Sequence, residues 1–566
     1  MKLYGRNNAV ENLGWTQGSK AATEPREGFG VRRIPALLFR PFEASLACVK
    51  AQRRNAAHSK RFATWASAQT PRSLGARWTI AVQSKRAMFS FLHSSLSGWL
   101  AFALAIFSCS VLMSQTGSLA ASAVKQPNIV FILADDLGYA ELGCYGQQKI
   151  QTPNIDRLAA EGMRFTQCYS GCHVCAPSRS TLMTGLHTGH TPIRENGGYR
   201  YLYDADVTVA EVLKKAGYAT GGFGKWGLGT EETSGFPLKQ GFDEWFGFYH
   251  QVHAHFYYPY YLWHNDTKFF LPENEGHKRA RYSHDEIHKQ ALHFINQHKD
   301  QPFFCYIPYT LPHVELVVPE DSMKPYRGKW EEKPLPDPRA GYIGAEEPFA
   351  THAGMVSRLD RSVGEVMALL KKLHLEDDTV LVFSSDNGPQ ASQWLRVADF
   401  FKANGPFRGY KGEFYEGGTR VPLVARWPGK IKSGTTNDHI CAFWDFLPTF
   451  AELAGTTVPN TIDGLSFAPA LLGRQQKQHD FLYWEMAQGK NLSQAVRMGN
   501  WKAIRHKPNG PVELYNLAED IGEKTNVAAK HDDVVDKIAR LMTTEHTAER
   551  AYPPEKGSQK PKDYVR

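Results

Sequence analysis

The sequence predicts an α/β fold with a large domain built on buried parallel strands and a smaller domain after it. Two apolar runs, at 129–133 and 380–383, are typical of buried parallel strands, and acidic and turn residues follow each of them. Beyond a polar, glutamine-rich break at 473–480, short apolar segments alternate with turns, as in an antiparallel sheet, and an amphipathic helix follows. We therefore expect the large domain at 124–475 and the small α+β domain at 476–566.

The charge distribution argues against nucleic acid as a partner. The 566 residues carry a formal net charge of +9. Residues 1–87 hold 16 Lys and Arg against 4 Asp and Glu, so the rest of the chain has a net charge of −3. Because the part that builds the core is not basic, we do not expect it to bind nucleic acid.

The first 123 residues have the pattern of an export segment. Basic residues precede Met88, an apolar run of 15 residues follows at 99–113, and Ala-Ser-Ala at 121–123 has the form of a signal-peptidase site. This run is shorter than the roughly 20 residues that span a bilayer, so we expect no stable membrane anchor. We predict that 1–87 is an untranslated or unstructured leader and 88–123 a signal peptide. The product would be periplasmic or extracellular, or lysosomal in a eukaryote.

Acidic side chains follow both predicted strands of the large domain. Asp135 and Asp136 come directly after the first strand, and Asp386 and Asn387 follow the second. Open α/β sheets build their sites at the carboxyl ends of the strands, so we expect these side chains to meet. Either strand end alone would be explained by turn formation. Together, three carboxylates and an amide oxygen suit Ca²⁺ or Mg²⁺, and the three acids would repel one another without a cation.

Two of the six cysteines beyond residue 123, Cys172 and Cys175, have the spacing of a redox or zinc motif. A four-sulfur zinc site needs a second close pair, but Cys144, Cys305 and Cys441 are isolated. A framework of disulfides would need a higher density of cysteines. The pair is therefore more consistent with other chemistry.

The sequence after Cys175 predicts a helix from about residue 178, because Pro177 suits a first helical turn. Cys175 would then lie just before a helix amino terminus, where free N–H groups attract anions. Arg179 adds a fixed positive guanidinium beside it.

The segment CAPSRSTLMTG, which starts at Cys175, resembles the signature of the sulfatase family, Cys-x-Pro-Ser-Arg followed by Leu-x-Thr-Gly. Further motifs occur in the family's order across nearly all of 127–525: NIVFILADD, GYATGGFGKWGLG, PHVELVVP, FSSDNG, GPFRGYKGEFYEGGTRVP, and VRMGNWKAI with VELYNL. Each motif alone is weak, but the ordered set is specific. The resemblance implies the alkaline-phosphatase-like fold: a central mixed, mostly parallel sheet between helices, and a smaller domain with an antiparallel sheet and a helix.

The resemblance also implies a reaction, the hydrolysis of a sulfate ester through formylglycine that a maturation enzyme makes from Cys175. One hydroxyl of the aldehyde hydrate attacks sulfur and expels the alcohol, and loss of a proton from the other lets sulfate leave. Arg179 would hold the hydrate. One Ca²⁺ per chain, on the four oxygen-bearing side chains named above, would act as Lewis acid and template.

The remaining roles are also implied by the resemblance. Lys225, in GKWGLG, and Lys411, in RGYKGEFYEGG, match the lysines that clamp sulfate oxygens. His313, in LPHVE, matches the histidine beside the leaving-group oxygen, and either His313 or Lys411 would protonate that oxygen. The alternatives are solvated lysines and a histidine that only packs in a loop.

One motif departs from the family pattern, which commonly reads Lys-Trp-His-Leu-Gly and uses its histidine to take the proton from the hydrate. Gly227 stands at that position. Either elimination is weakened or another base reaches the site. His253 and His255 would share one face of an extended segment, and we expect His255 to substitute, with packing as the alternative. The surrounding aromatic residues, at 246–265, would form a platform for a sugar ring or a packed lid.

The sequence leaves the substrate open between sulfated small molecules and sulfated glycans. The motif set looks most like arylsulfatases and N-acetylgalactosamine-6-sulfatases. Two other functions remain as alternatives: a phosphonate or phosphate ester hydrolase of the same fold, and a non-catalytic binder of sulfated glycans, which Gly227 would permit. Without the maturation enzyme, Cys172 and Cys175 could form a disulfide, and Cys168 could pair with either.

Overall fold

The computed structural model describes residues 125–197, 200–336, 342–390, 395–488 and 491–552. The predicted leader and signal peptide lie outside the described residues. Within the described ranges, no helix is both long enough and apolar enough to cross a membrane.

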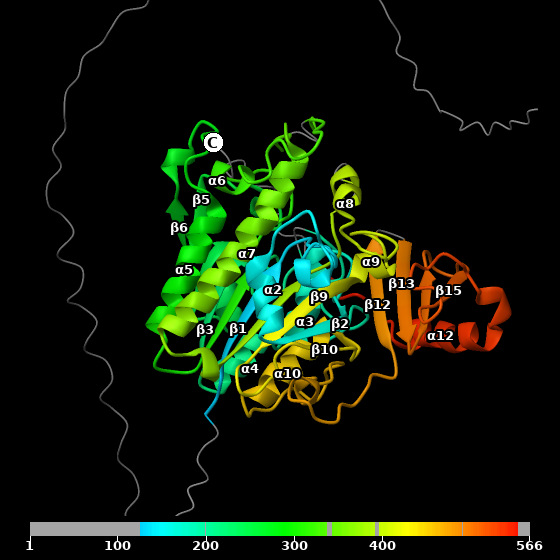
Figure 1. Ribbon diagram of the computed structural model, residues 1–566. Helices are drawn as coiled ribbons and strands as arrows, with labels where there is room; N and C mark the ends of the chain where they lie inside the picture. The colour runs from blue at the N-terminus through cyan, green and yellow to red at the C-terminus, as the bar shows by residue number, and fades with distance from the viewer. Residues whose placement is uncertain (1–124, 198–199, 337–341, 391–394, 489–490, 553–566) are drawn as a thin grey trace, which may run out of the picture. The chain divides into compact units, whose positions relative to one another are not determined.

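A large mixed sheet forms the centre of the fold (Figure 1). Its strands, from one edge to the other, are β10 (Thr435–Asn437), β2 (Met163–Tyr169), β9 (Arg420–Arg426), β8 (Thr379–Ser385), β1 (Asn128–Ala134), β7 (Phe303–Pro308), β3 (Ala219–Lys225), β4 (Glu244–Phe248), β5 (Tyr261–His264) and β6 (Thr267–Phe270), and β11 (Cys441–Ala442) pairs with β2. The five strands from β8 through β1, β7 and β3 to β4 pair in parallel. Antiparallel pairing of β9 with β8 and β2, and of β5 with β4 and β6, makes the sheet mixed.

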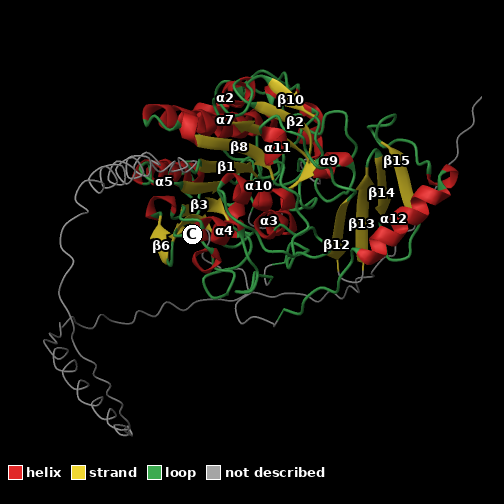
Figure 2. Ribbon diagram, turned by 90° about the horizontal axis from the view of Figure 1, so that it is seen from below, coloured by secondary structure: helices red, strands yellow, loops and turns green. Residues whose placement is uncertain are grey.

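Helices cover both faces of this sheet, because its central strands are apolar on both sides. In β1, Ile129, Phe131 and Leu133 enter one core, and Val130 and Ile132 enter the other. One face is covered by α2 (Pro153–Ala160), α5 (Ser283–Gln297) and α7 (Pro348–Lys372). The other face is covered by α3 (Cys175–Thr184), α4 (Val209–Lys215) and α10 (Phe446–Leu453), and Figure 2 shows α2 and α7 on the opposite side from these three.

Short elements connect these layers. The remaining short α-helices are α6 (Glu320–Met323), α8 (Leu395–Phe401), α9 (Glu416–Thr419) and α11 (Ala468–Leu471). The 3-10 turns are η1 (Gly143–Tyr145), η2 (Pro237–Gln240), η3 (His253–His255), η4 (Pro272–Asn274), η5 (Glu376–Asp378), η7 (Phe443–Asp445) and η8 (Ala528–Lys530).

A separate antiparallel sheet follows the large one. It consists of β12 (Leu482–Gln488), β13 (Asn491–Met498), β14 (Trp501–Arg505) and β15 (Val512–Asn516), each paired with the next. Alternation along the strands gives it two apolar faces. One packs on α12 (Asp532–Thr544) through Ile538 and Met542, and the other packs against Trp444 and Phe414 of the large domain.

The architecture confirms the predicted fold class, with two local corrections. Helix α3 begins at Cys175, earlier than the predicted residue 178, so Cys175 is its first residue and Pro177 its third. The prediction of an extended segment at His253 and His255 was wrong, because these residues form the 3-10 turn η3. In such a turn, residues two apart do not share a face.

Candidate active site

The predicted site residues come together at one edge of the large sheet. Asp135 and Asp136 follow β1, Asp386 and Asn387 follow β8, and Lys225 ends β3. Because these strands are parallel or joined through parallel β7, their carboxyl ends lie at the same edge. A hydrogen bond from the Asp136 N–H to Asp386 Oδ1, at 3.1 Å, ties the two acidic turns together.

Three cationic side chains neutralise the three buried acids. Arg179 donates to Asp386 Oδ2 from Nε and Nη2 at 2.9 and 2.7 Å. Lys225 Nζ lies 2.7 Å from Asp135 Oδ2, and Lys411 Nζ lies 2.8 Å from Asp136. The metal ion was predicted because the three acids would repel one another. Arg179, Lys225 and Lys411 relieve part of that repulsion. A metal ion is instead favoured by the arrangement of the ligand oxygen atoms that do not pair with these cations.

Asp135 and Asp136 are both buried, but their pKa values differ because they have different charged neighbours. Burial alone would raise the pKa of Asp135, but the charges of Lys225 and Arg179 bring it well below its usual value. Burial and the neighbouring carboxylate raise the pKa of Asp136 against the opposing effect of Lys411. Such uneven pKa values within one buried cluster are typical of functional sites.

An amide oxygen without a partner lies beside these acids. Asn387 donates Nδ2 to Asp136 Oδ1 at 2.7 Å and to the Gly388 carbonyl at 2.9 Å. Its Oδ1 is buried and has no hydrogen-bond partner among the described residues. Buried polar atoms are almost always satisfied, so this oxygen fits a cation ligand. Ligand atoms of Asp135, Asp136, Cys175 and His313 also lie within 4.8 Å of one another.

Cys175 lies against the acids at the start of α3. Its Sγ is 3.3 Å from Asp135 Oδ1 and 3.8 Å from Asp136 Oδ1. Burial, followed by the charges of Asp135 and Asp386, raises the pKa of the thiol well above its usual value. The cysteine itself is therefore a protonated thiol at neutral pH and a poor nucleophile. All six cysteines of the described part are free, which leaves Cys172 and Cys168 unpaired with Cys175.

His313 and Lys411 form a pair against Asp136, the acid that also lies 3.8 Å from Cys175 Sγ. The His313 Nδ1–H donates to the Val314 carbonyl at 2.8 Å, which leaves the Nε2 lone pair facing Lys411 Nζ at 3.1 Å. Burial and the charge of Lys411 lower the pKa of His313 well below its usual value, so the ring is neutral. In this arrangement the ammonium of Lys411 is the proton donor and His313 the acceptor.

The two histidines of η3 differ in position. His255 stacks on His313 with ring centroids 4.4 Å apart, and its Nδ1 lies 2.5 Å from the Tyr342 hydroxyl. His253 packs among aromatic rings, against Phe248 and Tyr261, and is buried. His255 thus lies next to His313, a predicted residue of the site.

Several neighbours of the site were not predicted. Asn196 accepts a hydrogen bond from the Ala176 N–H at 2.8 Å and so caps the start of α3. Tyr342 reaches His255 from a distant segment, and Gln251 lies beside Gly227. No spacing or motif marks these residues, because only the tertiary fold brings them to the site.

A second cluster, elsewhere in the fold, joins two histidines and an acid. Ligand atoms of His187, His190 and Asp463 lie within 4.8 Å of one another. The Gly189 N–H donates to His187 Nδ1 at 3.1 Å, so the neutral ring has its proton on Nε2. Burial lowers the pKa of His187 to about 3, so the ring is neutral at pH 7. We interpret the cluster as a structural link to Glu545, 3.6 Å away.

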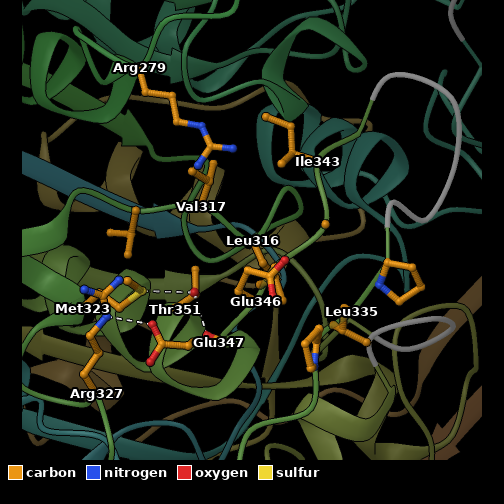
Figure 3. Close-up of a pocket in the computed structure, with 15 residues that line it drawn as sticks. Arg279, Leu316, Val317, Met323, Arg327, Leu335, Ile343, Glu346, Glu347 and Thr351 are labelled. Atoms are coloured by element: carbon orange, nitrogen blue, oxygen red, sulfur yellow. Dashed lines mark hydrogen bonds and ion pairs between the residues drawn. The ribbon is translucent and has the colours of Figure 1, made fainter.

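A cavity of about 790 Å³ opens next to the segment that follows His313 (Figure 3). Its apolar lining includes Leu316, Val317, Val318, Met323, Leu335 and Ile343. The charged groups at its wall are Arg279, Arg327, Glu346 and Glu347. Arg327 is paired with Glu347 at 2.7 Å, whereas Arg279 has no ion-pair partner in the described ranges. Figure 3 shows the Arg279 side chain extending toward Val317.

Comparisons with known proteins agree with this geometry. The family model described as Sulfatase matches residues 127–456, and the model of the N-sulphoglucosamine sulphohydrolase C-terminal region matches residues 409–550. The chain is 34% identical to human arylsulfatase A over 76% of this chain and 90% of that protein. It is 30% identical to the N-acetylgalactosamine-6-O-sulfatase of Bacteroides thetaiotaomicron over 75% of this chain and 94% of that protein.

A solved structure has the same fold over most of the chain. The crystal structure of Ps i-CgsB in complex with k-i-k-neocarrahexaose superposes with a TM-score of 0.65 at 30% identity and covers 75% of this chain and 94% of that one. The mixed, mostly parallel sheet with a separate antiparallel sheet is thus the alkaline-phosphatase-like fold. Because the family model spans more than half of the chain and the relatives match over most of their length, the chain belongs to the sulfatase family.

Proposed function

We propose that this sulfatase hydrolyses the sulfate ester of a carbohydrate at a formylglycine made from Cys175. One observation carries the proposal: Cys175 is the first residue of α3, lies 3.3 Å from Asp135, and faces the site that Lys225, Lys411 and His313 surround. A formylglycine supplies a hydrated aldehyde, whose hydroxyl is the nucleophile toward sulfur. Comparing the turnover of matched aryl sulfate and aryl phosphate esters tests the proposal against a phosphate or phosphonate ester hydrolase, and a protein that only binds sulfated glycans would turn over neither.

The side chains of the site would have separate roles in binding the ester and moving protons. Lys225 and Lys411 would bind the sulfate oxygens, and Arg179 would hold the side chain at 175. Lys411 would give its proton to the leaving oxygen, because the neutral His313 has its lone pair toward Lys411. His255 stays a predicted base for the step that releases sulfate. Burial lowers the pKa of His255 well below its usual value, so it has a free lone pair at neutral pH.

The same site would hold one Ca²⁺ on Asp135, Asp136, Asp386 and Asn387. The unpartnered Asn387 Oδ1 and the adjacent carboxylates support this assignment. When bound, Ca²⁺ supplies a Lewis acid toward sulfate. Asp386 would contribute mainly through the oxygen that does not pair with Arg179.

Calcium is expected to stabilise the folded protein. At a concentration about 100 times its dissociation constant, it would add about 2.7 kcal/mol to the free energy of unfolding, since it binds only the folded site. Calorimetry with added calcium and with a chelator measures the shift in melting temperature. The variant Asn387→Ala should lose the shift, whereas Asp536→Asn, at an exposed position on α12, should keep it. A shift of equal size in both variants would contradict the assignment.

A sulfated glycan suits this site better than a small aryl sulfate. The cavity of Figure 3 lies beside the catalytic residues, because Ile343 at its wall donates to Glu315 and follows Tyr342, which contacts His255. Its volume and mixed apolar and polar wall are those of a site for a sugar ring. The names of the relatives, which include N-acetylgalactosamine-6-sulfatases and a complex with a carrageenan oligosaccharide, support the same substrate class.

Arg279 is expected to bind a second anionic group of the glycan, since its guanidinium has no ion-pair partner in the described part of the chain. The variant Arg279→Ala should raise the KM for a sulfated tetrasaccharide about 10-fold and leave the KM for an aryl sulfate unchanged. The neighbouring Lys278→Ala, outside the cavity, serves as the control. Equal KM values for the tetrasaccharide in all three proteins would argue against this role.

The proposal also includes the predicted partners and location. A formylglycine-generating enzyme would act on Cys175 before α3 packs, because the folded residue is buried. Export to the periplasm or outside the cell remains a prediction from residues 88–123. The domain boundary at 475/476 remains a prediction as well, and the start of the antiparallel sheet at Leu482 supports it.

A further inference from the structure

The end of strand β3 has a backbone conformation that only glycine adopts easily. Gly227, two residues after Lys225, has φ of +79° and donates its N–H to the Tyr249 carbonyl at 3.1 Å. A Cβ placed on Gly227 would lie 2.8 Å from Nε2 of Gln251 and 3.0 Å from its Cδ. The side-chain amide of Gln251 therefore occupies the space into which a side chain at 227 would extend.

The side-chain nitrogen of Gln251 has no hydrogen-bond partner in the described part of the chain. This Nε2 atom is buried. Unsatisfied buried donors are rare and need an explanation, which in a site is usually a bound ligand or water. This donor lies beside the turn that follows Lys225, whose ammonium is 2.7 Å from Asp135, the acid next to Cys175.

We propose that Gln251 donates its side-chain N–H to an oxygen of the sulfate ester bound at residue 175, as a further substrate-binding residue of this site. This inference rests on the proposed function. A primary amide neither gains nor loses a proton near neutral pH, so the contact binds and orients the ester and moves no proton. Gly227 then contributes to substrate binding, because its lack of a side chain leaves room for the Gln251 amide.

The variant Gln251→Met tests this role, because methionine keeps the length of the side chain and removes the donor. We expect kcat/KM for a sulfate ester to fall about 10-fold or more, since a hydrogen bond to a charged oxygen is lost. The control is Gln148→Met, at an exposed position away from the site. Melting temperature and the formylglycine content at residue 175, measured by mass spectrometry, show whether folding and maturation are intact.

A second variant keeps the test independent of packing. Gln251→Glu places a titratable carboxylate beside the sulfate, so its activity should be lowest above the pKa of the glutamate and recover as the pH falls. A pH–rate profile identical to that of the wild-type protein would overturn the inference, as would unchanged kcat/KM in Gln251→Met. If the wild-type protein releases no sulfate at all, the proposed function fails instead.

Discussion

A Cys175→Ala variant is expected to release sulfate at least about 1,000-fold more slowly than the wild-type protein, as is typical when a covalent nucleophile is removed. Alanine cannot be converted to an aldehyde, and no other nucleophile touches both Asp135 and Asp136 in the described site. The surrounding lysines would still bind the ester. The loss should therefore appear in kcat, with a small change in KM, when sulfate release is followed by ion chromatography.

Cys172→Ala is the matched control, because this cysteine lies in the loop just before α3 but packs in the core between the large domain and the antiparallel sheet. It should keep the turnover of the wild-type protein. Mass spectrometry of the peptide that contains residue 175 identifies its chemical form. An active wild-type protein with an intact thiol at 175, or a Cys175→Ala variant with more than a tenth of the activity, would contradict the proposal.

Local patterns in the sequence are enough to predict the fold class and the edge of the sheet where the site lies. The run at 129–133 is a strand because it is apolar on both faces, and the run at 380–383 pairs with it in parallel. Parallel strands bring their carboxyl ends together, so the meeting of Asp135 with Asp386 follows from strand direction. Helix boundaries are less certain from sequence: α3 starts at Cys175, directly after Val174, whose backbone is extended.

The parts that could not be predicted depend on contacts between distant segments. The three acids predict a cation, but sequence alone does not reveal that Lys225, Lys411 and Arg179 lie against them. The sequence shows that position 227 is a glycine and not a histidine. It does not show that the side chain of Gln251 occupies the space beside Gly227, because that depends on the course of the loop after β4. His253 and His255 likewise have different surroundings because they lie in the 3-10 turn η3, which the sequence pattern at 246–265 did not indicate.

The largest effect on stability is expected at Lys502, which joins the antiparallel sheet to the large domain. Its Nζ lies 2.9 Å from Glu416 Oε1, and both side chains are fully buried. Lys502→Met would leave the Glu416 carboxylate with Arg420 as its remaining ion-pair partner and lower the free energy of unfolding by about 3 kcal/mol. Urea denaturation measures the loss. Lys507→Met, at an exposed position in the loop between β14 and β15, should change stability by less than about 0.5 kcal/mol.

The pH dependence of stability provides an independent test of this pair. Burial alone would raise the pKa of Glu416, but Lys502, Arg420 and Arg497 lower it from 4.5 to about 2. Because the unfolded chain binds this proton first as the pH falls, the contribution is complete above about pH 4.5 and is lost toward pH 2. In Lys502→Met the folded-state pKa of Glu416 rises toward the unfolded value, so the loss of stability between about pH 4.5 and pH 2 should be smaller than in the wild-type protein. A double variant that also carries Glu416→Gln should lose less stability than the sum of the single variants. The reason is that the buried Glu416 carboxylate, which Lys502→Met alone leaves without its lysine, is then absent. Strictly additive losses, with an unchanged pH profile, would mean that the two side chains do not depend on each other.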